Sequence, residues 1–552
     1  MGINKNTFGI WDNMNNVKYR ILYGICFFAL MLIDWSRGSQ RGVVWEMTVN
    51  FTGVVVAVIL LSMTEIKRFK HVIYLAWSLL GAVSIPISLW WWQNHQTLIY
   101  RDKLWSAVLS VWMLGYLAIY EWRYWGIKRW LKCLVDKKRS IVLYAMLFWM
   151  FFSLNEDIWP IWYLFMVVLF VGMPRTEIKQ TMLEKGLVDG IIAGFFVLQG
   201  LAFVFRPYDM LDKRYVGMYA NANMNALFYC IATMALLTRL YEMYRDDAPK
   251  WQRVMIGILL AGVCAFQLLT VSRTGVMTTV VLLVAYVILV LFIIRKRTAG
   301  QVLLSIAGFV ATVCIMVPVT YSVARYIPPL FHHPIWYDGE YSEDKVHSWD
   351  PIDSEKYVTF DEVLNQFHIR TGGLSIQSHA LELFIDEGEE VTNYQPGGIT
   401  VAGKYFEYGS PELLRHETWY GRLSIWEHYL KNGTLLGHSN SWGHRTGMYG
   451  ITWHGQNAFV QFWFYYGIPV AILYLIWVIN GLIVGCKRAI KGSSAGMIML
   501  LSMITAFVFG LFEAIWYPAQ MILFLMIFTQ VIYGDDRGML VALEEGKEIP
   551  FR

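Results

Sequence analysis

Residues 254–294 read VMIGILLAGVCAFQLLTVSRTGVMTTVVLLVAYVILVLFII, two apolar runs separated by the short turn Val271-Ser-Arg-Thr-Gly275. Each run is long enough to cross the hydrocarbon core of a bilayer as a helix, which takes roughly 17–25 residues. The rest of the chain repeats this pattern, since 56% of its residues are hydrophobic and only 16% are charged. A soluble domain does not need so much apolar material, so we expect a membrane protein with many spans.

The sequence predicts an all-α polytopic membrane protein with about fourteen transmembrane helices. Residues 1–321 would contain helices 1–11, residues 322–455 an extramembrane loop domain, and residues 456–552 helices 12–14. The predicted spans centre near Phe27, Val55, Leu80, Trp112, Met146, Phe165, Ala193, Ile231, Leu259, Leu283, Ala311, Leu473, Met503 and Leu525.

The loops between these spans alternate in charge. If the N-terminus is cytoplasmic, most cation-rich loops fall on the cytoplasmic side, as the positive-inside rule requires, and the exceptions are Arg206, Lys213, Arg214 and Arg273. The cytoplasmic loops include residues 67–70, 123–139, 175–185, 239–253, 295–297 and 487–488. The long loop at residues 322–455 is then extracytoplasmic. It is acidic and irregular in periodicity, and we expect short helices in it, such as residues 420–431, between loops.

Chemistry-bearing residues concentrate in and around this loop. It contains ten of the twelve histidines and none of the six cysteines, which excludes a disulfide scaffold there. Neither an H-E-x-x-H nor a C-x-x-C spacing occurs, so we expect no metal and no cofactor.

Three predicted spans begin at the extracytoplasmic side with polar residues. The eighth follows Arg214 and Asn221-Ala-Asn223, the tenth begins at Ser272-Arg273-Thr274, and the twelfth follows His454 and Asn457. Helix N-termini favour bound anions, and arginine forms forked hydrogen bonds with phosphate oxygens. We therefore expect one anion site at the outer membrane surface. The competing interpretation is that these cations are interfacial anchors.

Several motifs carry a resemblance to a known family. In order they are Arg214…Gly217-Met-Tyr-Ala-Asn-Ala-Asn223, Ser272-Arg-Thr-Gly275, Gly421-Arg-Leu-Ser-Ile-Trp426, Leu435-Leu-Gly437 and His454…Asn457…Tyr466-Gly-Ile-Pro469. Over residues 200–485 the chain resembles the O-antigen ligase and O-antigen polymerase superfamily. It departs from that pattern at Ala222, where the family has proline, at the His454–Asn457 spacing, and at Gly437-His438-Ser439, where Gly-x-Gly is expected.

The resemblance implies a function. Members of this family transfer a glycan from an undecaprenyl-pyrophosphate carrier to an acceptor hydroxyl, without a metal, at the outer face of the bacterial cytoplasmic membrane. By this resemblance Arg214 and Arg273 would stabilise the departing pyrophosphate and His454 would deprotonate the acceptor. The predicted substrate-binding residues are Arg206, Arg422, Asn221, Asn223, Asn457 and Trp426. The expected partners are the polyprenyl-linked donor, a glycan or lipid-glycan acceptor and the bilayer, with no nucleic acid.

Other interpretations stay open at this point. A flippase or transporter for lipid-linked oligosaccharides is the main alternative, although the predicted spans are nearly free of internal charge, which favours a surface enzyme. A non-catalytic scaffold is a further one. His454 is equally explained as an interfacial histidine, and the sequence does not separate a polymerase from a ligase.

Overall fold

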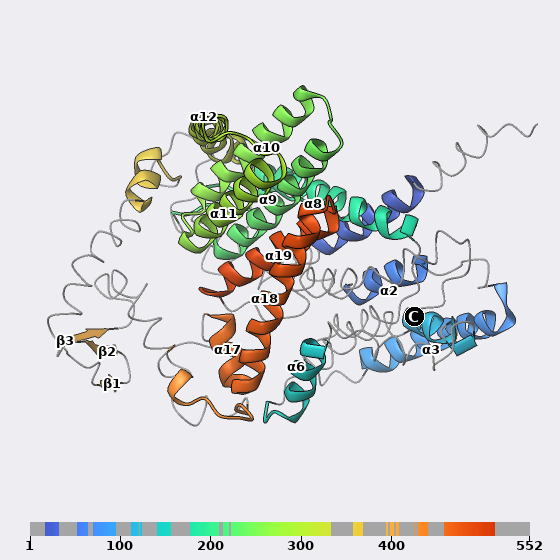
Figure 1. The fold of residues 1–552 in the computed structure, drawn as a ribbon. Coiled ribbons are helices and arrows are strands. Elements are labelled where there is room, and N and C mark those ends of the chain that lie inside the picture. The colour runs from blue at the N-terminus through green and yellow to red at the C-terminus, as the bar shows by residue number, and fades with distance from the viewer. Residues whose placement is uncertain are drawn as a thin grey trace, which may run out of the picture.

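The structure is a computed structural model of the 552-residue chain. It describes residues 17–32, 52–63, 70–94, 112–120, 122–123, 141–155, 160, 177–208, 213–219, 222–332, 357–367, 393–395, 398–401, 404–407, 426, 429–439 and 457–513. In these residues the chain is predominantly helical (Figure 1).

Six helices in the described part of the chain are long and apolar enough to cross a membrane. They are α8 (Glu177–Phe205), α9 (Ala222–Arg245), α10 (Lys250–Leu269), α11 (Arg273–Tyr286) with its π-helical continuation η5 (Val287–Ile294), α12 (Ala299–Phe331) and α18 (Ile468–Ile490). Further helices are α2 (Thr52–Met63), α3 (Val72–Asn94), α6 (Ile141–Phe152), α17 (Ala458–Tyr465) and α19 (Ser494–Gly510). The chain is therefore a helical membrane protein.

The predicted span centres compare well with these helices. The centres near Phe165 and Leu525 lie outside the described residues, and each of the others lies in a described helix. The total of fourteen spans stays a prediction. The apolar runs locate the helices because a backbone in lipid must satisfy its hydrogen bonds within the segment.

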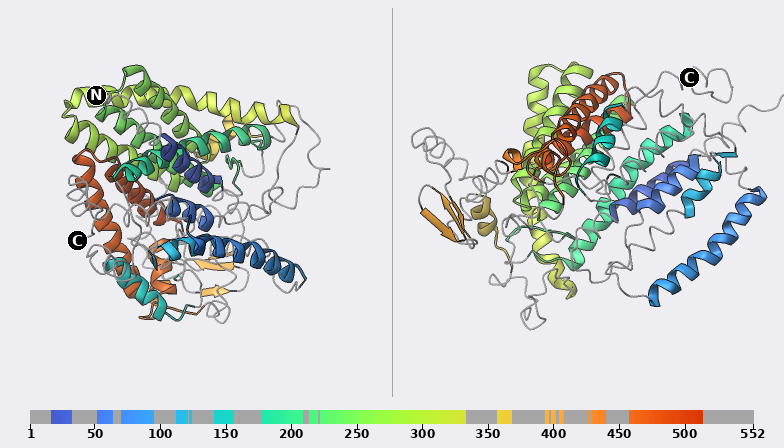
Figure 2. Two further views of the ribbon diagram at one scale, coloured as in Figure 1. Left: turned by 90° about the vertical axis from the view of Figure 1, so that its right-hand side faces the viewer. Right: turned by 90° about the horizontal axis from the view of Figure 1, so that it is seen from below.

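Helix α9 forms the centre of the bundle. It packs against α8, α10, α11 and α19, and most of its side chains are buried. Its polar residues Asn225, Thr233 and Thr238 are almost fully enclosed. By contrast, α12 packs on α10 and α8 at the periphery, with Leu303 and Leu304 on its exposed side (Figures 1 and 2). The long helix with the lowest mean hydropathy, α9, thus lies inside the protein, whereas the more apolar α12 faces outward.

The C-terminal helices form a hairpin beside this centre. Helices α18 and α19 pack closely along each other, and α6 packs on α18 (Figure 1). The chain turns between α18 and α19 at Gly492, whose φ is +90°. Helix α19 also contacts α9 and α11, which brings the end of the described chain to the centre of the bundle.

A small sheet is the non-helical exception. Strands β1 (Asn393–Gln395), β2 (Gly398–Val401) and β3 (Lys404–Glu407) form an antiparallel sheet in the order β1-β2-β3, away from the helices in Figure 1. The sequence predicts only short helices and loops in this region. Strands of three or four residues are too short to show a two-residue alternation, which explains the difference. In the predicted helix at 420–431, the described residues 426 and 429–431 are helical.

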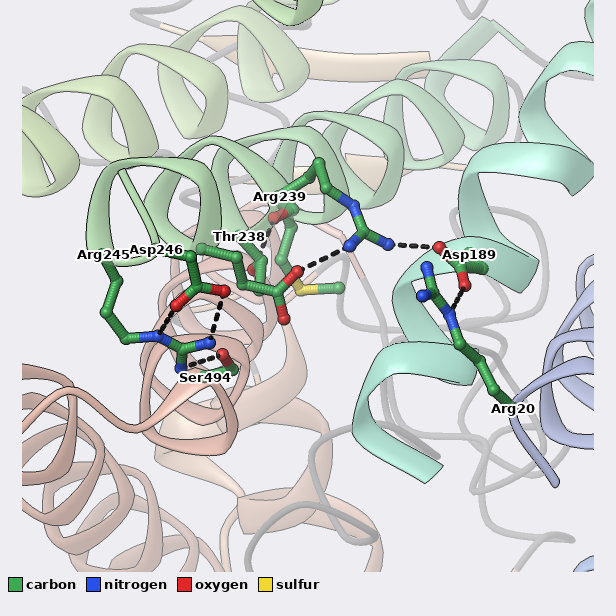
Figure 3. A network of polar contacts seen from close by, with 9 residues as sticks. Arg20, Asp189, Thr238, Arg239, Arg245, Asp246 and Ser494 are labelled. Carbon is green, nitrogen blue, oxygen red and sulfur yellow. Dashed lines mark hydrogen bonds and ion pairs between the residues drawn. The ribbon is translucent and has the colours of Figure 1, made fainter. Parts of the chain in front are cut away.

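Charged side chains connect the helices at one end of the bundle (Figure 3). Asp189 of α8 accepts hydrogen bonds from Arg20, at 2.5 Å, and from Arg239 of α9. Arg239 also donates to Glu242 at 2.8 Å. Near the end of α9, Arg245 donates to the Ser494 hydroxyl at 2.9 Å and so joins α9 to the start of α19. We call Arg20, Asp189, Arg239 and Glu242 the inner charge network.

This network differs from the prediction in one respect. From the sequence we expect residues 239–253 to form a loop and the spans to be nearly free of charge. In the structure, α9 extends to Arg245 and includes Arg239 and Glu242. Asp189 likewise lies inside α8. These charges are tolerated within helices because each acid faces an arginine.

We expect Asp189→Asn to lower the free energy of unfolding by roughly 1–3 kcal/mol, between the values typical of exposed and buried ion pairs. The substitution removes the carboxylate that Arg20 and Arg239 share. Thermal unfolding of the purified protein in detergent measures the loss. The matched control is Asp246→Asn, whose side chain is 56% exposed and pairs with its neighbour Arg245. Equal losses in the two variants would contradict this role for Asp189.

Candidate functional site

Three helix N-termini carry polar residues at the end of the bundle opposite the inner charge network. Asn223 lies in the first turn of α9, and Ser272 caps α11 by accepting a hydrogen bond from the Gly275 amide. Asn457 caps α17 in the same way, with the Val460 amide as donor at 3.1 Å. Serine and asparagine are preferred at this position because their side chains satisfy an otherwise unpaired backbone N–H.

The Asn223 amide joins four segments of the chain. Its oxygen accepts hydrogen bonds from Arg214 Nη2, at 2.8 Å, and from the Ser272 hydroxyl, at 3.0 Å. Its nitrogen donates to Glu513 Oε1 at 2.6 Å. These contacts connect residues 213–219, α9, the cap of α11 and the segment after α19. We call Arg214, Asn223, Ser272 and Glu513 the outer polar network.

Arg214 is held at a second point. Its Nε donates to the Thr270 carbonyl at 2.9 Å, and the adjacent Tyr215 amide donates to the Leu269 carbonyl at 2.9 Å. The segment 213–219 is thereby fixed to the end of α10. Arg273 is the first residue of α11 and follows Ser272 directly, so the structure brings the backbones of Arg214 and Arg273 to the same corner.

The α10–α11 turn contains an unusual backbone conformation. Val271 has φ of +48° and is buried. This region is costly for a β-branched residue, by about 1–3 kcal/mol, and such strain often occurs at functional sites. Hydrogen bonds on both sides hold it, from the Val271 amide to the Leu268 carbonyl and from the Ser272 amide to the Thr270 hydroxyl.

Asn457 extends the same corner to α17. Its Nδ2 donates to the Leu511 carbonyl at 2.9 Å, two residues before Glu513. The Trp426 ring lies 6.4 Å from the ring of Phe512, the residue between them. The predicted site residues Arg214, Asn223, Asn457 and Trp426 are thus gathered around residues 511–513.

Other predicted site residues are placed differently. Arg206 is 4% exposed, and its Nε donates to the Gly217 carbonyl at 2.7 Å. It therefore holds the segment 213–219 from its buried side. Burial raises the pKa of the neighbouring Tyr215 phenol, which the Gln199 hydrogen bond and the Arg206 charge offset only in part. Tyr215 therefore stays neutral. Asn221, Arg422 and His454 lie outside the described residues.

The sequence pattern does not predict two residues of this corner, Glu513 and Gln267. Glu513 is the acid in the otherwise apolar stretch Leu511-Phe-Glu-Ala-Ile-Trp516. Gln267 of α10 is 1% exposed, and its amide has no hydrogen-bond partner among the described residues. It lies directly against α11, because a Cβ added at Gly275 would be 2.0 Å from its Nε2. Buried amides are normally paired, so Gln267 is an exception among the described residues.

Two segments that carry motifs of the sequence, residues 434–438 and 465–468, are joined by backbone hydrogen bonds beside α17. The His438 amide donates to the Tyr465 carbonyl at 3.3 Å, and the Ile468 amide donates to the Thr434 carbonyl at 3.0 Å. The Leu154 amide, just after α6, donates to the Leu436 carbonyl at 2.8 Å. Residues 434–438 are therefore bound both to the α17–α18 junction and to the end of α6. We call this pair of segments, 434–438 and 465–468, the clasp.

Glycine is required on both sides of the clasp. Gly437 and Gly467 have φ of +71° and +100°, a region that residues with a Cβ rarely adopt. A Cβ on Gly437 would lie 2.1 Å from the Tyr465 carbonyl oxygen, and one on Gly467 would lie 2.2 Å from that of Leu435. The motifs Leu435-Leu-Gly437 and Tyr466-Gly-Ile-Pro469 are thus two halves of one backbone contact.

Gly467→Ala is expected to lower the free energy of unfolding by more than about 1–3 kcal/mol, because it adds a backbone clash to the strain of a positive φ. Thermal unfolding in detergent measures this loss. Gly257→Ala is the control, since a Cβ there meets no atom within 4 Å and alanine favours a helix interior. If both variants unfold at the wild-type temperature, the clasp does not contribute to stability.

The described part of the chain contains no group of three His, Cys, Asp or Glu side chains that is suited to hold a metal ion. The corner is instead built from arginine, amide, hydroxyl and a single carboxylate at converging helix ends. In comparisons with known proteins, neither the family models nor the curated proteins give a match to this chain.

Proposed function

We propose that the protein transfers a glycan from an undecaprenyl-pyrophosphate carrier to an acceptor hydroxyl at the outer face of the bacterial cytoplasmic membrane. The observation that carries this proposal is that Asn223 joins Arg214 to the N-termini of α9 and α11, where Arg273 begins α11, while the N-terminus of α17 is bonded to Leu511, two residues before Glu513. Such ends direct free N–H groups and partial positive charge to one place, which suits a diphosphate.

The contacts of Arg214 suit the stabilisation of a leaving group. The Thr270 carbonyl and the Asn223 amide fix its guanidinium before any substrate binds. A cation that is oriented in advance loses no energy to reorganisation when pyrophosphate charge develops. Gln267 and the strained Val271 turn add a buried polar group and stored backbone strain beneath the same corner.

The remaining roles follow the family resemblance. His454, three residues before Asn457, is the proposed base for the acceptor hydroxyl. Glu513 has a positioning role in this proposal: it accepts from Asn223 Nδ2 and so keeps the amide oxygen directed at Arg214 and Ser272. The donor is a lipid-linked glycan, and the acceptor is another glycan or a lipid-glycan.

A second candidate function is movement of a lipid-linked oligosaccharide across the membrane. The inner charge network favours it, because ionisable residues inside spans often mark a translocation path. However, Asp189 and Glu242 are each bonded to an arginine, an arrangement that also serves helix packing alone. We therefore place transport second.

Arg214→Ala and Arg273→Ala are each expected to lower glycan transfer by about 10²–10³-fold, the loss typical of removing one transition-state donor. The assay is complementation of a strain from which the gene is deleted, followed by profiling of undecaprenyl-linked oligosaccharides. Single repeats accumulate in the deletion strain if the protein is a polymerase, and full-length chains accumulate if it is a ligase.

The matched control is Arg297→Ala, which removes an exposed cation after η5. It should restore the wild-type profile, and the other two variants should be inserted at wild-type levels. Complementation by Arg214→Ala and Arg273→Ala would refute the transferase proposal. Accumulation of repeats on the cytoplasmic face would support transport instead.

Glu513→Ala is expected to reduce transfer by roughly tenfold or more, because a hydrogen bond to a charged group is lost and the Asn223 amide is released. Glu513→Gln keeps an acceptor for Asn223 and should retain most of the activity. The same complementation assay, quantified against protein level, compares the two. If the glutamine variant is as inactive as the alanine variant, the charge of Glu513 matters and its positioning role is wrong.

A further inference from the structure

Gln199 and Gln267 are both buried in the bundle, but their side-chain amides differ in their contacts. Gln199 Nε2 donates to the Tyr215 hydroxyl at 2.9 Å, and its Oε1 accepts from the Tyr229 hydroxyl at 2.7 Å. In the part of the chain that the structure describes, neither end of the Gln267 amide has a hydrogen-bond partner. A buried amide without partners destabilises the folded protein, so Gln267 calls for a role that offsets this cost.

The Gln267 amide is directed at the first turn of α11. Gly275 is the third residue of that helix, and a Cβ added there would overlap Gln267 Nε2 and lie 2.6 Å from Ala226 Cβ of α9. The amide therefore fills the space that the missing side chain of Gly275 leaves. The first N–H groups of a helix have no partner within it and favour anions, so Gln267 Nε2 adds one more N–H donor at a place suited to an anion.

The polar groups around Gly275 are bonded to each other rather than to Gln267. The Gly275 amide donates to the Ser272 hydroxyl at 3.3 Å, and the Gly275 carbonyl accepts from the Cys230 thiol at 3.6 Å. The same thiol lies 3.7 Å from the Thr279 hydroxyl. These neighbours therefore satisfy one another, and a partner for the Gln267 amide has to come from a bound molecule.

Thr270 connects Gln267 to the outer polar network. Its hydroxyl donates to the Gln267 carbonyl at 2.7 Å and accepts from the Ser272 amide at 3.2 Å. The Thr270 carbonyl accepts from Arg214 Nε at 2.9 Å. One buried threonine thus joins the backbone of Gln267 to the cap of α11 and to the guanidinium of Arg214.

Contact between Gln267 and a bound molecule requires a movement of the α10–α11 turn, because the Gln267 side chain is buried in the free protein. Val271 lies in this turn with a φ of +48°, which is a costly conformation for a β-branched residue. A movement that returned Val271 to a negative φ would relieve this strain. The relief would partly offset the energy needed to expose the Gln267 amide.

We propose that Gln267 is a further binding residue for the pyrophosphate of the lipid-linked donor. When the pyrophosphate binds at the start of α11, the turn moves at Val271, and Gln267 Nε2 donates to a phosphate oxygen. This inference rests on the proposed function, which supplies the ligand. It adds a neutral donor of fixed direction to the cations Arg214 and Arg273, at a position outside the motifs of the sequence.

Binding of undecaprenyl pyrophosphate to the purified full-length protein in detergent, measured by microscale thermophoresis, tests this inference. Gln267→Met keeps a side chain of similar length without the amide. It should weaken the binding by roughly tenfold or more, the effect typical of a lost hydrogen bond to a charged group. Undecaprenol, which has no phosphate, should bind equally to this variant and to the wild type. Unchanged affinity for undecaprenyl pyrophosphate, or an equal loss of affinity for undecaprenol, would overturn the inference.

Thermal unfolding without added ligand separates a binding role of Gln267 from a packing role. Gln267→Met should unfold at or above the wild-type temperature, because it removes a buried amide that has no partner. The matched variant Gln199→Met breaks two hydrogen bonds and should unfold at a lower temperature. If Gln267→Met loses as much stability as Gln199→Met, Gln267 has a packing role and the inference is wrong.

Arg214→Ala distinguishes a failure of this inference from a failure of the proposed function. If Arg214→Ala weakens the binding of undecaprenyl pyrophosphate and Gln267→Met does not, the role of Gln267 is wrong and the transferase proposal stands. If the wild type does not bind undecaprenyl pyrophosphate, both are wrong.

Discussion

The side-chain amide of Asn223 is the contact on which the end of the bundle where α9 and α11 begin depends. An amide has an acceptor end and a donor end, and here the acceptor end faces Arg214 and Ser272 while the donor end faces Glu513. The residues that meet it come from before α9, from the α10–α11 turn and from beyond α19. If the amide were rotated by 180°, its nitrogen would face the Arg214 donor and its oxygen would face the Glu513 carboxylate. The observed orientation is therefore the one that satisfies all three neighbours. Four segments are thereby fixed relative to one another.

The central helix is held by polar contacts at both ends. Asn223 holds one end of α9, and Arg239 and Arg245 hold the other through Asp189 of α8 and Ser494 of α19. In lipid the hydrophobic effect does not drive helices together, so packing and polar contacts must determine which helices associate. The ends of α9 differ in charge, however. The inner contacts pair acids with arginines, whereas the outer corner combines one carboxylate with Arg214 and the start of α11.

The sequence predicts the helices and the grouping of three N-termini, but not the contacts among them. Apolar length locates α9, α11 and α18, and alternation of loop charge assigns Asn223, Ser272 and Asn457 to one side. Glu513 is 290 residues from its partner Asn223, and no local pattern relates two residues so far apart. The pairing of Asp189 with Arg239 was missed for a similar reason. Hydropathy ends a span at the first charges, although the helix itself continues when those charges have partners.

The clasp has a mechanical consequence. Residues 434–438 belong to the long polar loop, yet they are hydrogen-bonded to both the α17–α18 junction and the end of α6. Asn457 connects the other end of α17 to Leu511, next to the outer polar network. Residues 434–438 are therefore connected to the corner that contains Arg214 through the eight residues of α17. A displacement of residues 434–438 would therefore act on α17 and, through Asn457, on the residues next to Glu513.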